Sequence, residues 1–362
     1  MRIAIYNVQN LFSRVRAMMS DDPTKTTVVL ADVAELQKLI EQQAYSDADK
    51  ARMLQILRKH KALTESGPFY LLETRRKLVS NNKILATGRG DWVGSIEWRR
   101  DLISAPAVEN TGRIISEIKA DVLCLVEVEN RPVLRRFNDT ILKAAPYPHA
   151  MVIDGNDERG IDVGIASRWP IHDMRSHVDD PDPETKRPVF SRDCPEFQID
   201  LPGTRSLWVL INHFKSRGYG SQASNDAKRK RQSERVSEIL KRFNLKKQWV
   251  VVVGDLNELP SSDSLAPLLA HPGLRNTFDK LPARADRWTH RDDATPSKNN
   301  QIDYVLISEA LWPRLQEVHI ERRGIWAYTK KARQKYPPLP TVTGDTNSAS
   351  DHAAVWAELD LG

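Results

Sequence analysis

Short apolar runs of strand length recur along the chain. The first, residues 3–8, alternates apolar and polar side chains, and six more are rich in β-branched residues: 121–126, 161–166, 207–212, 248–253, 302–307 and 353–359. Helical spacing of apolar residues is found at 111–118, 132–142 and 225–243. Because helices intervene between some strands but not all, the pattern predicts an α/β sandwich with mixed sheets and not a strict repeat of parallel crossovers.

The pattern changes between residues 14 and 110. Residues 31–40 and 47–63 carry apolar side chains three and four positions apart, and Ser46 or Asp47 is a suitable N-cap for the second of these segments. We therefore expect one domain over residues 1–362 that contains a mostly helical insertion at 14–110.

Polar side chains stand where the apolar runs begin or end, which is where α/β enzymes build their sites. Taken singly, each has an ordinary structural explanation: a turn former, a surface acid or a satisfied core histidine. The set comprises Asn7, Glu127, His213, Asp255, Asn257, Asp351 and His352. Asp303 differs because it lies inside an apolar run, where an unpaired carboxylate is costly. We expect a histidine as its partner.

In this order, the polar positions resemble the endonuclease/exonuclease/phosphatase superfamily of metal-dependent phosphodiesterases. The matching elements are Tyr6-Asn7, Val126-Glu127, Asn212-His213, Gly254-Asp255-Leu256-Asn257, Ile302-Asp303-Tyr304 and Ser350-Asp351-His352. The family usually has Gln where this chain has Val126. Three further segments are similar to a bacterial nuclease-like branch: Asn7 to Phe12, Phe190-Ser-Arg-Asp193 and Asn212-His-Phe-Lys-Ser216. The resemblance covers the chain outside the segment 14–110, and it implies a four-layered sandwich of two mixed β-sheets flanked by helices.

The resemblance also implies roles for these residues. Glu127 would be the principal metal ligand, with Asn7 and Asp351 completing or supporting the site. Asp255 would orient or deprotonate the attacking water, and Asn257 would hold that water or a phosphate oxygen. His352, paired with Asp303, would act as a general base or as a charged clamp, and His213 as a general acid or a phosphate donor.

The residue types themselves indicate the metal and the phosphate contacts. Carboxylates and amides favour Mg²⁺, with Mn²⁺ possible, over zinc, and no organic cofactor is expected. Arg159 is a suitable phosphate contact because a guanidinium matches a phosphate with two parallel hydrogen bonds, and Lys215 is a weaker one. Asp162 stays open between a site role and a structural role.

Charge and composition favour a polyanionic partner. The net charge is +6 and the pI about 9.2. Nine Lys or Arg lie between Lys228 and Lys247, and six between Arg322 and Lys335, where Trp326 and Tyr328 are interleaved. Two distant cysteines and the absence of a leader or a bilayer-length apolar run predict a cytoplasmic protein without membrane contact.

The sequence thus predicts a metal-dependent nuclease that cleaves DNA or RNA by in-line attack of an activated water. One alternative is the same chemistry on a small or lipid phosphate, although no phosphoinositide-type motif is present. A second is a non-catalytic nucleic-acid-binding relative, although every catalytic position holds a competent residue. The sequence does not decide between DNA and RNA or between endo- and exonucleolytic cleavage. It also leaves open the number of metals and the oligomeric state.

Overall fold

The computed structural model describes residues 1–11, 13–18, 23–102, 105–157, 159–203, 205–218, 220–292, 299–327 and 329–362. Phe12 and Tyr328, which the sequence singled out, lie outside these residues. The chain divides into two compact units, one of Met1–Phe12 with Ser104–Gly362 and one of Ser13–Ile103. Each unit is described by itself.

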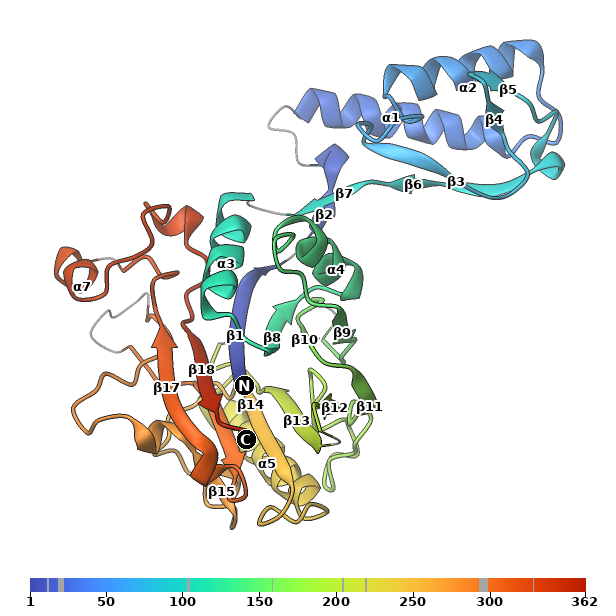
Figure 1. Ribbon diagram of the computed structural model, residues 1–362. Coiled ribbons are helices and arrows are strands. Elements are labelled where there is room, and N and C mark those ends of the chain that lie inside the picture. Colours follow the sequence, from blue (N-terminus) through green and yellow to red (C-terminus); the bar gives the residue numbers. More distant parts are fainter. Residues whose placement is uncertain are drawn as a thin grey trace. The chain divides into compact units, whose positions relative to one another are not determined.

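The larger unit contains two six-stranded sheets (Figure 1). The first runs in the order β17 (Leu315–Glu321), β18 (Ala354–Leu359), β1 (Arg2–Leu11), β8 (Val122–Val128), β10 (Asp162–Ser167) and β9 (His149–Ile153). The second runs in the order β11 (Ile171–Arg175), β12 (Glu196–Leu201), β13 (Arg205–His213), β14 (Trp249–Asp255), β16 (Asp303–Ser308) and β15 (Leu274–Asn276). In both sheets a central pair is parallel, β1 with β8 and β13 with β14, and the other neighbours are antiparallel.

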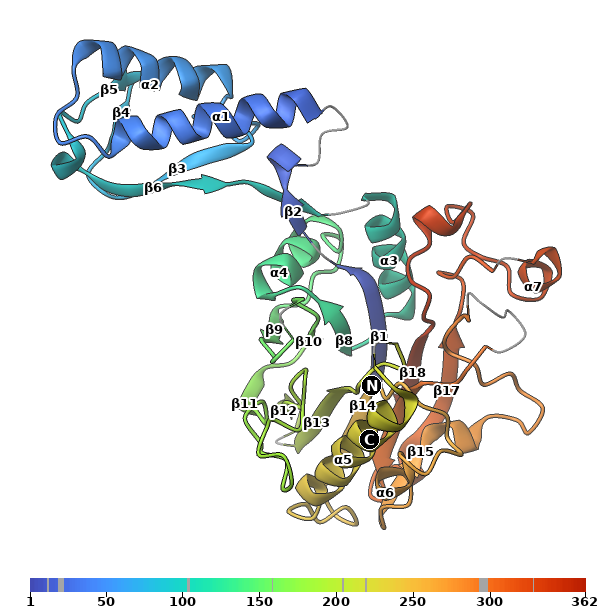
Figure 2. The ribbon, with the colours of Figure 1, turned by 180° about the vertical axis from the view of Figure 1, so that it is seen from behind.

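The two sheets face each other across one apolar core. Alternate residues of each strand point into it, such as Ile3 and Ile5 of β1 and Val251 and Val253 of β14. On the outer face of the second sheet, Val252 and its neighbours pack under helices α5 (Gln222–Leu240) and α6 (Ala266–Leu269) (Figure 2). Helices α3 (Ala105–Ile118) and α4 (Arg131–Thr140) contact the first sheet. The predicted four-layered sandwich of two mixed sheets is therefore confirmed.

Short elements complete the larger unit. They are the 3₁₀ helices η3 (Thr277–Lys280), η5 (Trp312–Arg314) and η6 (Asp345–Asn347) and the helix α7 (Lys330–Lys335). In the part of the chain that the structure describes, no helix is long and apolar enough to span a bilayer. Both cysteines, Cys124 and Cys194, are buried as free thiols.

The smaller unit is not mostly helical. Its helices are α1 (Pro23–Ile40) and α2 (Asp47–Lys59), preceded by η1 (Arg16–Met18), and Ser46 caps α2 in a capping box with Asp49. Three two-stranded ribbons follow or enclose them: β2 (Ser13–Val15) with β7 (Arg100–Leu102), β3 (Phe69–Arg75) with β6 (Val93–Trp98), and β4 (Val79–Ser80) with β5 (Lys83–Ile84), together with η2 (Arg89–Asp91).

These strands correct the prediction of a mostly helical insertion at 14–110. Leu36, Met53, Ile56, Phe69 and Trp92 form one core that joins the helices to the ribbons. The strands are short and irregular, so their apolar residues show no alternation that a sequence reading could detect. The boundary also shifts, because α3 begins at Ala105 and belongs to the larger unit.

Candidate functional site

Three polar side chains stand opposite one another on neighbouring strands of the second sheet. His213 ends β13 and pairs in register with Asp255, which ends β14 and pairs in turn with Asp303 of β16. All three are buried. Gly254 permits the close approach of β14 to β13, because a Cβ there would lie 2.1 Å from the carbonyl oxygen of Asn212. The three inner strands β13, β14 and β16 thus place one histidine and two acids side by side at one end of the sheet.

The first sheet brings Asn7 and Glu127 to the same place. The Asn7 Nδ2 atom donates to Glu127 Oε1 and to Asp255 Oδ2, both at 3.2 Å, and lies 3.4 Å from His352 Nε2. The Asn7 Oδ1 atom accepts the backbone N–H of Gln9 at 3.1 Å. One buried amide therefore joins residues from both sheets, and its orientation suits a supporting part better than direct metal ligation.

Three residues of this cluster have a left-handed backbone conformation. Gln9, Glu127 and Asn257 have φ of 41°, 64° and 53°, in the left-handed region that non-glycine residues seldom occupy. Such residues cost on the order of 1–3 kcal/mol each and persist where the surrounding structure fixes them. Asn257 is held by its N–H to Asp255 Oδ1 at 2.9 Å and by its Nδ2 to the carbonyl of Phe214 at 3.2 Å.

His352 is paired with Asp303 and is the kind of partner that this buried carboxylate requires. Its Nδ1 lies 2.9 Å from Asp303 Oδ2, and its backbone N–H donates to Ser350 Oγ. Burial disfavours the imidazolium, but the negative charges of Asp303 and Asp255 outweigh this effect and raise the pKa of His352 well above its ordinary value. The surrounding charges therefore favour the protonated ring.

His213 is the electrostatic opposite of His352. Its Nε2 lies 3.9 Å from Glu127 Oε1 and 3.8 Å from Asp255 Oδ2, which is too far for a hydrogen bond, and its buried Nδ1 has no hydrogen-bond partner among the residues that the structure describes. Burial, together with the positive charges of Arg192 and His352, lowers its pKa well below the ordinary value. The surroundings therefore favour the neutral ring of His213.

The carboxylates around Asn7 fit a cation. Burial raises the pKa of Glu127, and burial with the charge of Asp303 raises that of Asp255 to about 7. Asp351 is partly buried, yet the nearby His290, 3.6 Å from its Oδ2, and the charge of His352 lower its pKa to about 2. Several acids held together out of water are stabilised by a hard divalent ion, and their oxygen atoms are the ligands such an ion prefers.

The predicted phosphate contacts lie near the cluster but already have protein partners. Arg159 makes a two-bonded pair with Asp157, through Nε at 2.8 Å and Nη2 at 2.7 Å, and its guanidinium is half exposed. The Lys215 Nζ atom donates to the carbonyls of Ser216 and Gly218. The charge of Arg159 acts on His213 and Lys215, so these groups share one electrostatic neighbourhood.

Two residues of the neighbourhood were missed by sequence reasoning. Arg192 is 3% exposed, with its Nε 3.3 Å from Asp157 Oδ2, and its charge acts on Glu127 and His213. In the sequence, the segment Phe190 to Asp193 stands out only through the family resemblance. His290, whose Nε2 lies 3.6 Å from Asp351 Oδ2, follows a short segment without periodic apolar residues, and nothing local marks it.

The structure does not favour either basic stretch as a free cationic surface. In the first, Arg229 is buried against Glu258, and Arg231, Arg235 and Arg242 each pair with an acid. In the second, the Arg322 guanidinium lies 4.5 Å from the ring centre of Trp288, and Arg333 lies 4.4 Å from that of Trp326. These side chains are used within the fold.

Asp162 has a structural contact. Its buried carboxylate accepts the backbone N–H of Gly155 at 2.9 Å, and burial raises its pKa to about 6.

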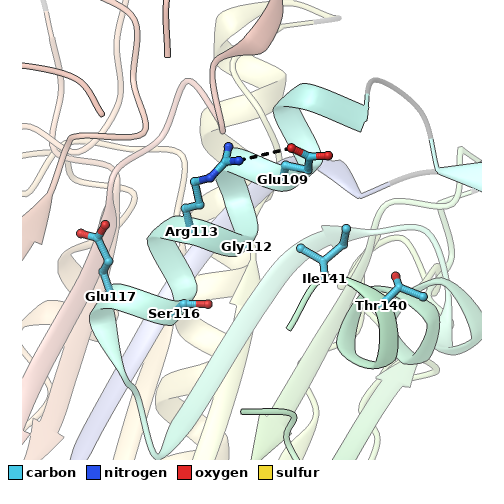
Figure 3. Close-up of a pocket in the computed structure, with 7 residues that line it drawn as sticks. All are labelled: Glu109, Gly112, Arg113, Ser116, Glu117, Thr140 and Ile141. Atoms are coloured by element: carbon cyan, nitrogen blue, oxygen red, sulfur yellow. Dashed lines mark hydrogen bonds and ion pairs between the residues drawn. The ribbon is translucent and has the colours of Figure 1, made fainter. Parts of the chain in front are cut away.

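A cavity of about 430 Å³ between α3 and α4 is separate from the cluster and contains none of the predicted residues (Figure 3). It is lined by Glu109, Gly112, Arg113, Ser116, Glu117, Thr140 and Ile141.

The sequence model of the Endonuclease/Exonuclease/phosphatase family matches residues 104–352, more than half of the chain. The chain belongs to this family. Its members are hydrolases of the nuclease and phosphatase type and are generally dependent on divalent metals, which agrees with the oxygen-rich cluster. None of the curated proteins matches the chain.

Solved structures share the fold of the family. An endonuclease/exonuclease/phosphatase from Beutenbergia cavernae aligns with a TM-score of 0.51 and 19% identity, over 70% of this chain and 66% of that one. An AP endonuclease from Archaeoglobus fulgidus aligns with a TM-score of 0.51 and 16% identity, over 70% and 94%. The D. rerio TDP2 complexed with a single-strand DNA product aligns with a TM-score of 0.50 and 14% identity, over 72% and 93%.

Proposed function

We propose that this protein is a Mg²⁺-dependent nuclease that hydrolyses phosphodiester bonds of DNA or RNA. The observation that carries the proposal is the convergence of Asn7, Glu127, Asp255 and the Asp303–His352 pair in one buried cluster. These residues span almost the whole chain, and a purely structural core would not gather so many ionisable groups at the cost of desolvating them.

The metal would be held chiefly by Glu127, with Asp351 as a second carboxylate and Asn7 orienting Glu127. When bound, such an ion polarises the phosphate and offsets the charge that develops during hydrolysis. Mn²⁺ offers the same coordination and is expected to substitute. The raised pKa of Glu127 and Asp255 is consistent with a deficit of positive charge in this cluster, which a divalent cation would fill.

Asp255 is the group suited to accept a proton from the attacking water. Its pKa of about 7 lies near neutral pH, where a general base is most effective. The N–H of Asn257 fixes one of its oxygens, and the amide of Asn7 fixes the other. Both oxygens are therefore held in place.

The two histidines would serve as donors to the phosphate. The raised pKa of His352 favours a charged clamp over a general base, because a protonated ring cannot accept a proton. The neutral His213 would donate a hydrogen bond and would not act as a general acid. Arg159, Arg192 and Lys215 supply positive charge beside His213, which suits the backbone of a nucleic acid.

Nucleic acid as the substrate class is supported by this charge and by the DNA product in the complex of the D. rerio protein. A cytoplasmic location remains part of the proposal and rests on the two free, buried thiols.

The test is cleavage of supercoiled plasmid, linear duplex and single-stranded RNA with Mg²⁺ or with EDTA. Asp255→Asn should abolish Mg²⁺-dependent cleavage, and Asp200→Asn, which alters a partly exposed acid on β12, should not. Cleavage in EDTA, or equal activity of the two variants, would refute the proposal.

A further inference from the structure

Beside the oxygen-rich cluster, a second group of ligand atoms combines two imidazoles with one carboxylate. It consists of His290, Asp351 and His352, whose ligand atoms all lie within 4.8 Å of one another. His290 Nε2 is 3.6 Å from Asp351 Oδ2, and His352 Nε2 is 3.9 Å from Asp351 Oδ1. The two rings are 4.6 Å apart between centroids.

The backbone fixes this group before any ligand binds. His290 and His352 form an antiparallel β-bridge, and His290 is also bridged to Asn300. The N–H of Arg291 donates to the carbonyl of Asp351 at 3.0 Å, and that of Ala353 to the carbonyl of Thr289 at 2.6 Å. Asp303 and Ser350 orient His352 from the other side. Little ordering would therefore be needed to form a site.

The donor set differs in kind from that around Glu127. Two imidazole nitrogens and one carboxylate oxygen suit borderline metals such as Zn²⁺ and Co²⁺, whereas oxygen ligands suit Mg²⁺. Tetrahedral zinc with bonds of about 2.0–2.2 Å holds its ligand atoms roughly 3.3–3.5 Å apart. The two separations from Asp351, 3.6 Å to His290 through Oδ2 and 3.9 Å to His352 through Oδ1, exceed this by a few tenths of an ångström, and all three ligand atoms lie within 4.8 Å of one another. Binding would therefore require side-chain rotation that draws the three ligand atoms together. The side chain of His290 is 27% exposed, so an ion can reach it.

We propose that His290, Asp351 and His352 form a binding site for a borderline transition metal, represented by Zn²⁺, and that its occupation switches the hydrolase off. The inhibitory part rests on the proposed function, because the ion would displace the Nε2 proton of the phosphate-clamping His352 into solvent and would occupy that nitrogen and an oxygen of Asp351. His290 is the residue that distinguishes this site from the site for Mg²⁺.

The binding part is tested without substrate. Co²⁺ is titrated into the full-length, metal-free protein and visible absorption is followed, because four-coordinate Co²⁺ with nitrogen ligands absorbs strongly. The wild type should show these bands and should lose them on addition of Zn²⁺. His290→Ala and His290→Gln should weaken the Co²⁺ affinity by at least about tenfold.

The matched control is His172→Ala, which removes an exposed histidine whose Nδ1 is 3.2 Å from the single carboxylate of Asp200. It should bind Co²⁺ as the wild type does. Absence of the bands in the wild type, or equal affinity of the wild type and both folded His290 variants, overturns the proposal. Circular dichroism establishes that at least one His290 variant is folded.

The inhibitory part is tested by adding Zn²⁺ to Mg²⁺-supported plasmid cleavage. Relative to its own zinc-free rate, each His290 variant should need at least about tenfold more Zn²⁺ than the wild type for half inhibition. Equal sensitivity overturns this part. If no Mg²⁺-dependent cleavage exists but the Co²⁺ bands depend on His290, the proposed function fails and the metal site stands.

Discussion

Two buried histidines of the larger unit, His177 and His352, both lie among acidic side chains. They differ in the hydrogen-bond acceptors that their ring nitrogens have. His177 has Asp180 Oδ2 2.7 Å from its Nδ1 and Glu196 Oε1 2.6 Å from its Nε2, and those acids pair with Arg235 and Arg242. His352 has a short acceptor only at Nδ1, and its Nε2 faces carboxylates at 3.8 and 3.9 Å. Both pKa values are raised.

The two histidines differ in whether their ring nitrogens and the surrounding acids all have hydrogen-bonding or charged partners. Around His177 each acid has a cation and each ring nitrogen has an acceptor, so the network is complete and stabilises the fold. Around His352 the acids outnumber the cations, and Asp303 Oδ1 is buried without a hydrogen-bond partner among the described residues. The Nε2 atom has the Asn7 amide at 3.4 Å and carboxylate oxygens only at 3.8 and 3.9 Å in the described part of the chain. Burial and a shifted pKa therefore do not by themselves identify a functional histidine, whereas an incomplete set of partners does.

The largest effect on activity is expected from His352→Gln. Loss of the charged ring should lower kcat by about 10²–10⁴-fold, the usual range for removal of a group that acts in proton transfer or on the reacting phosphate. Steady-state kinetics on a labelled oligonucleotide with Mg²⁺ measure this. His177→Gln is the matched variant, and a similar loss of kcat in its folded form would remove the distinction between the two histidines.

The largest effect on stability is expected from His177→Ala. Removal of one member of a buried charge network costs about 3–5 kcal/mol because the remaining charges lose their partner. Urea unfolding should show this decrease, while kcat of the folded fraction stays within a few-fold of the wild type. A stability loss below that of an exposed substitution such as His172→Ala would show that the network is not structural.

Asp303→Asn is expected to lower kcat by about 10²-fold. The amide keeps the size of the side chain but removes the charge that holds the pKa of His352 up. An NMR titration of the ring should show that pKa moving down toward its ordinary value. An unchanged titration would mean that Asp255 and Asp351 alone keep the ring charged.

The pH dependence of stability should separate His177→Gln from the wild type. Burial lowers the pKa of His177, but the hydrogen bond with Glu196 and the charge of Asp180 outweigh it, and the folded-state pKa lies above 6.5. The stabilising contribution is therefore complete below about pH 6.5 and is lost as pH rises through the folded-state pKa. The stability difference between the two proteins should thus be larger at about pH 6 than at about pH 9, which urea unfolding at the two pH values measures. A difference that stays constant or grows with pH would contradict a charged His177 in the folded protein.

The smallest expected effect is that of Arg159→Ala. Its guanidinium is half exposed and shared with Asp157, so its loss should raise KM about tenfold, equivalent to about 1.4 kcal/mol, with kcat little changed. Arg175→Ala, an exposed arginine of β11, is the control. An equal rise in KM for both variants would indicate only a general effect of net charge.

Much of the larger unit could be predicted because its central strands are continuous β-branched runs. β1, β8, β13, β14, β16 and β18 were all expected, and they carry the polar residues that converge. The edge strands β9, β11, β15 and β17 were missed because short or half-exposed strands lack a clear apolar pattern. The strand β12, next to an edge, was also missed, although Phe197, Ile199 and Leu201 alternate there with polar residues.

The parts of the site that could not be predicted depend on tertiary contacts. Arg192 joins the site neighbourhood through its burial beside Asp157, and His290 through its bridge to His352. The opposite charge states of His213 and His352 follow from which acids surround each ring in the folded protein. These contacts and charge states depend on residues far away in the sequence, so the neighbouring residues do not reveal them.

The most direct test of the central claim is the Mg²⁺ dependence of plasmid cleavage by the wild type and by Glu127→Gln, which keeps the shape of the side chain and removes its charge. We expect the wild type to cleave only with a divalent ion, and the variant to need far more Mg²⁺ or to be inactive. Identical Mg²⁺ titration curves for the two proteins would contradict the assignment of this cluster as the metal-dependent site.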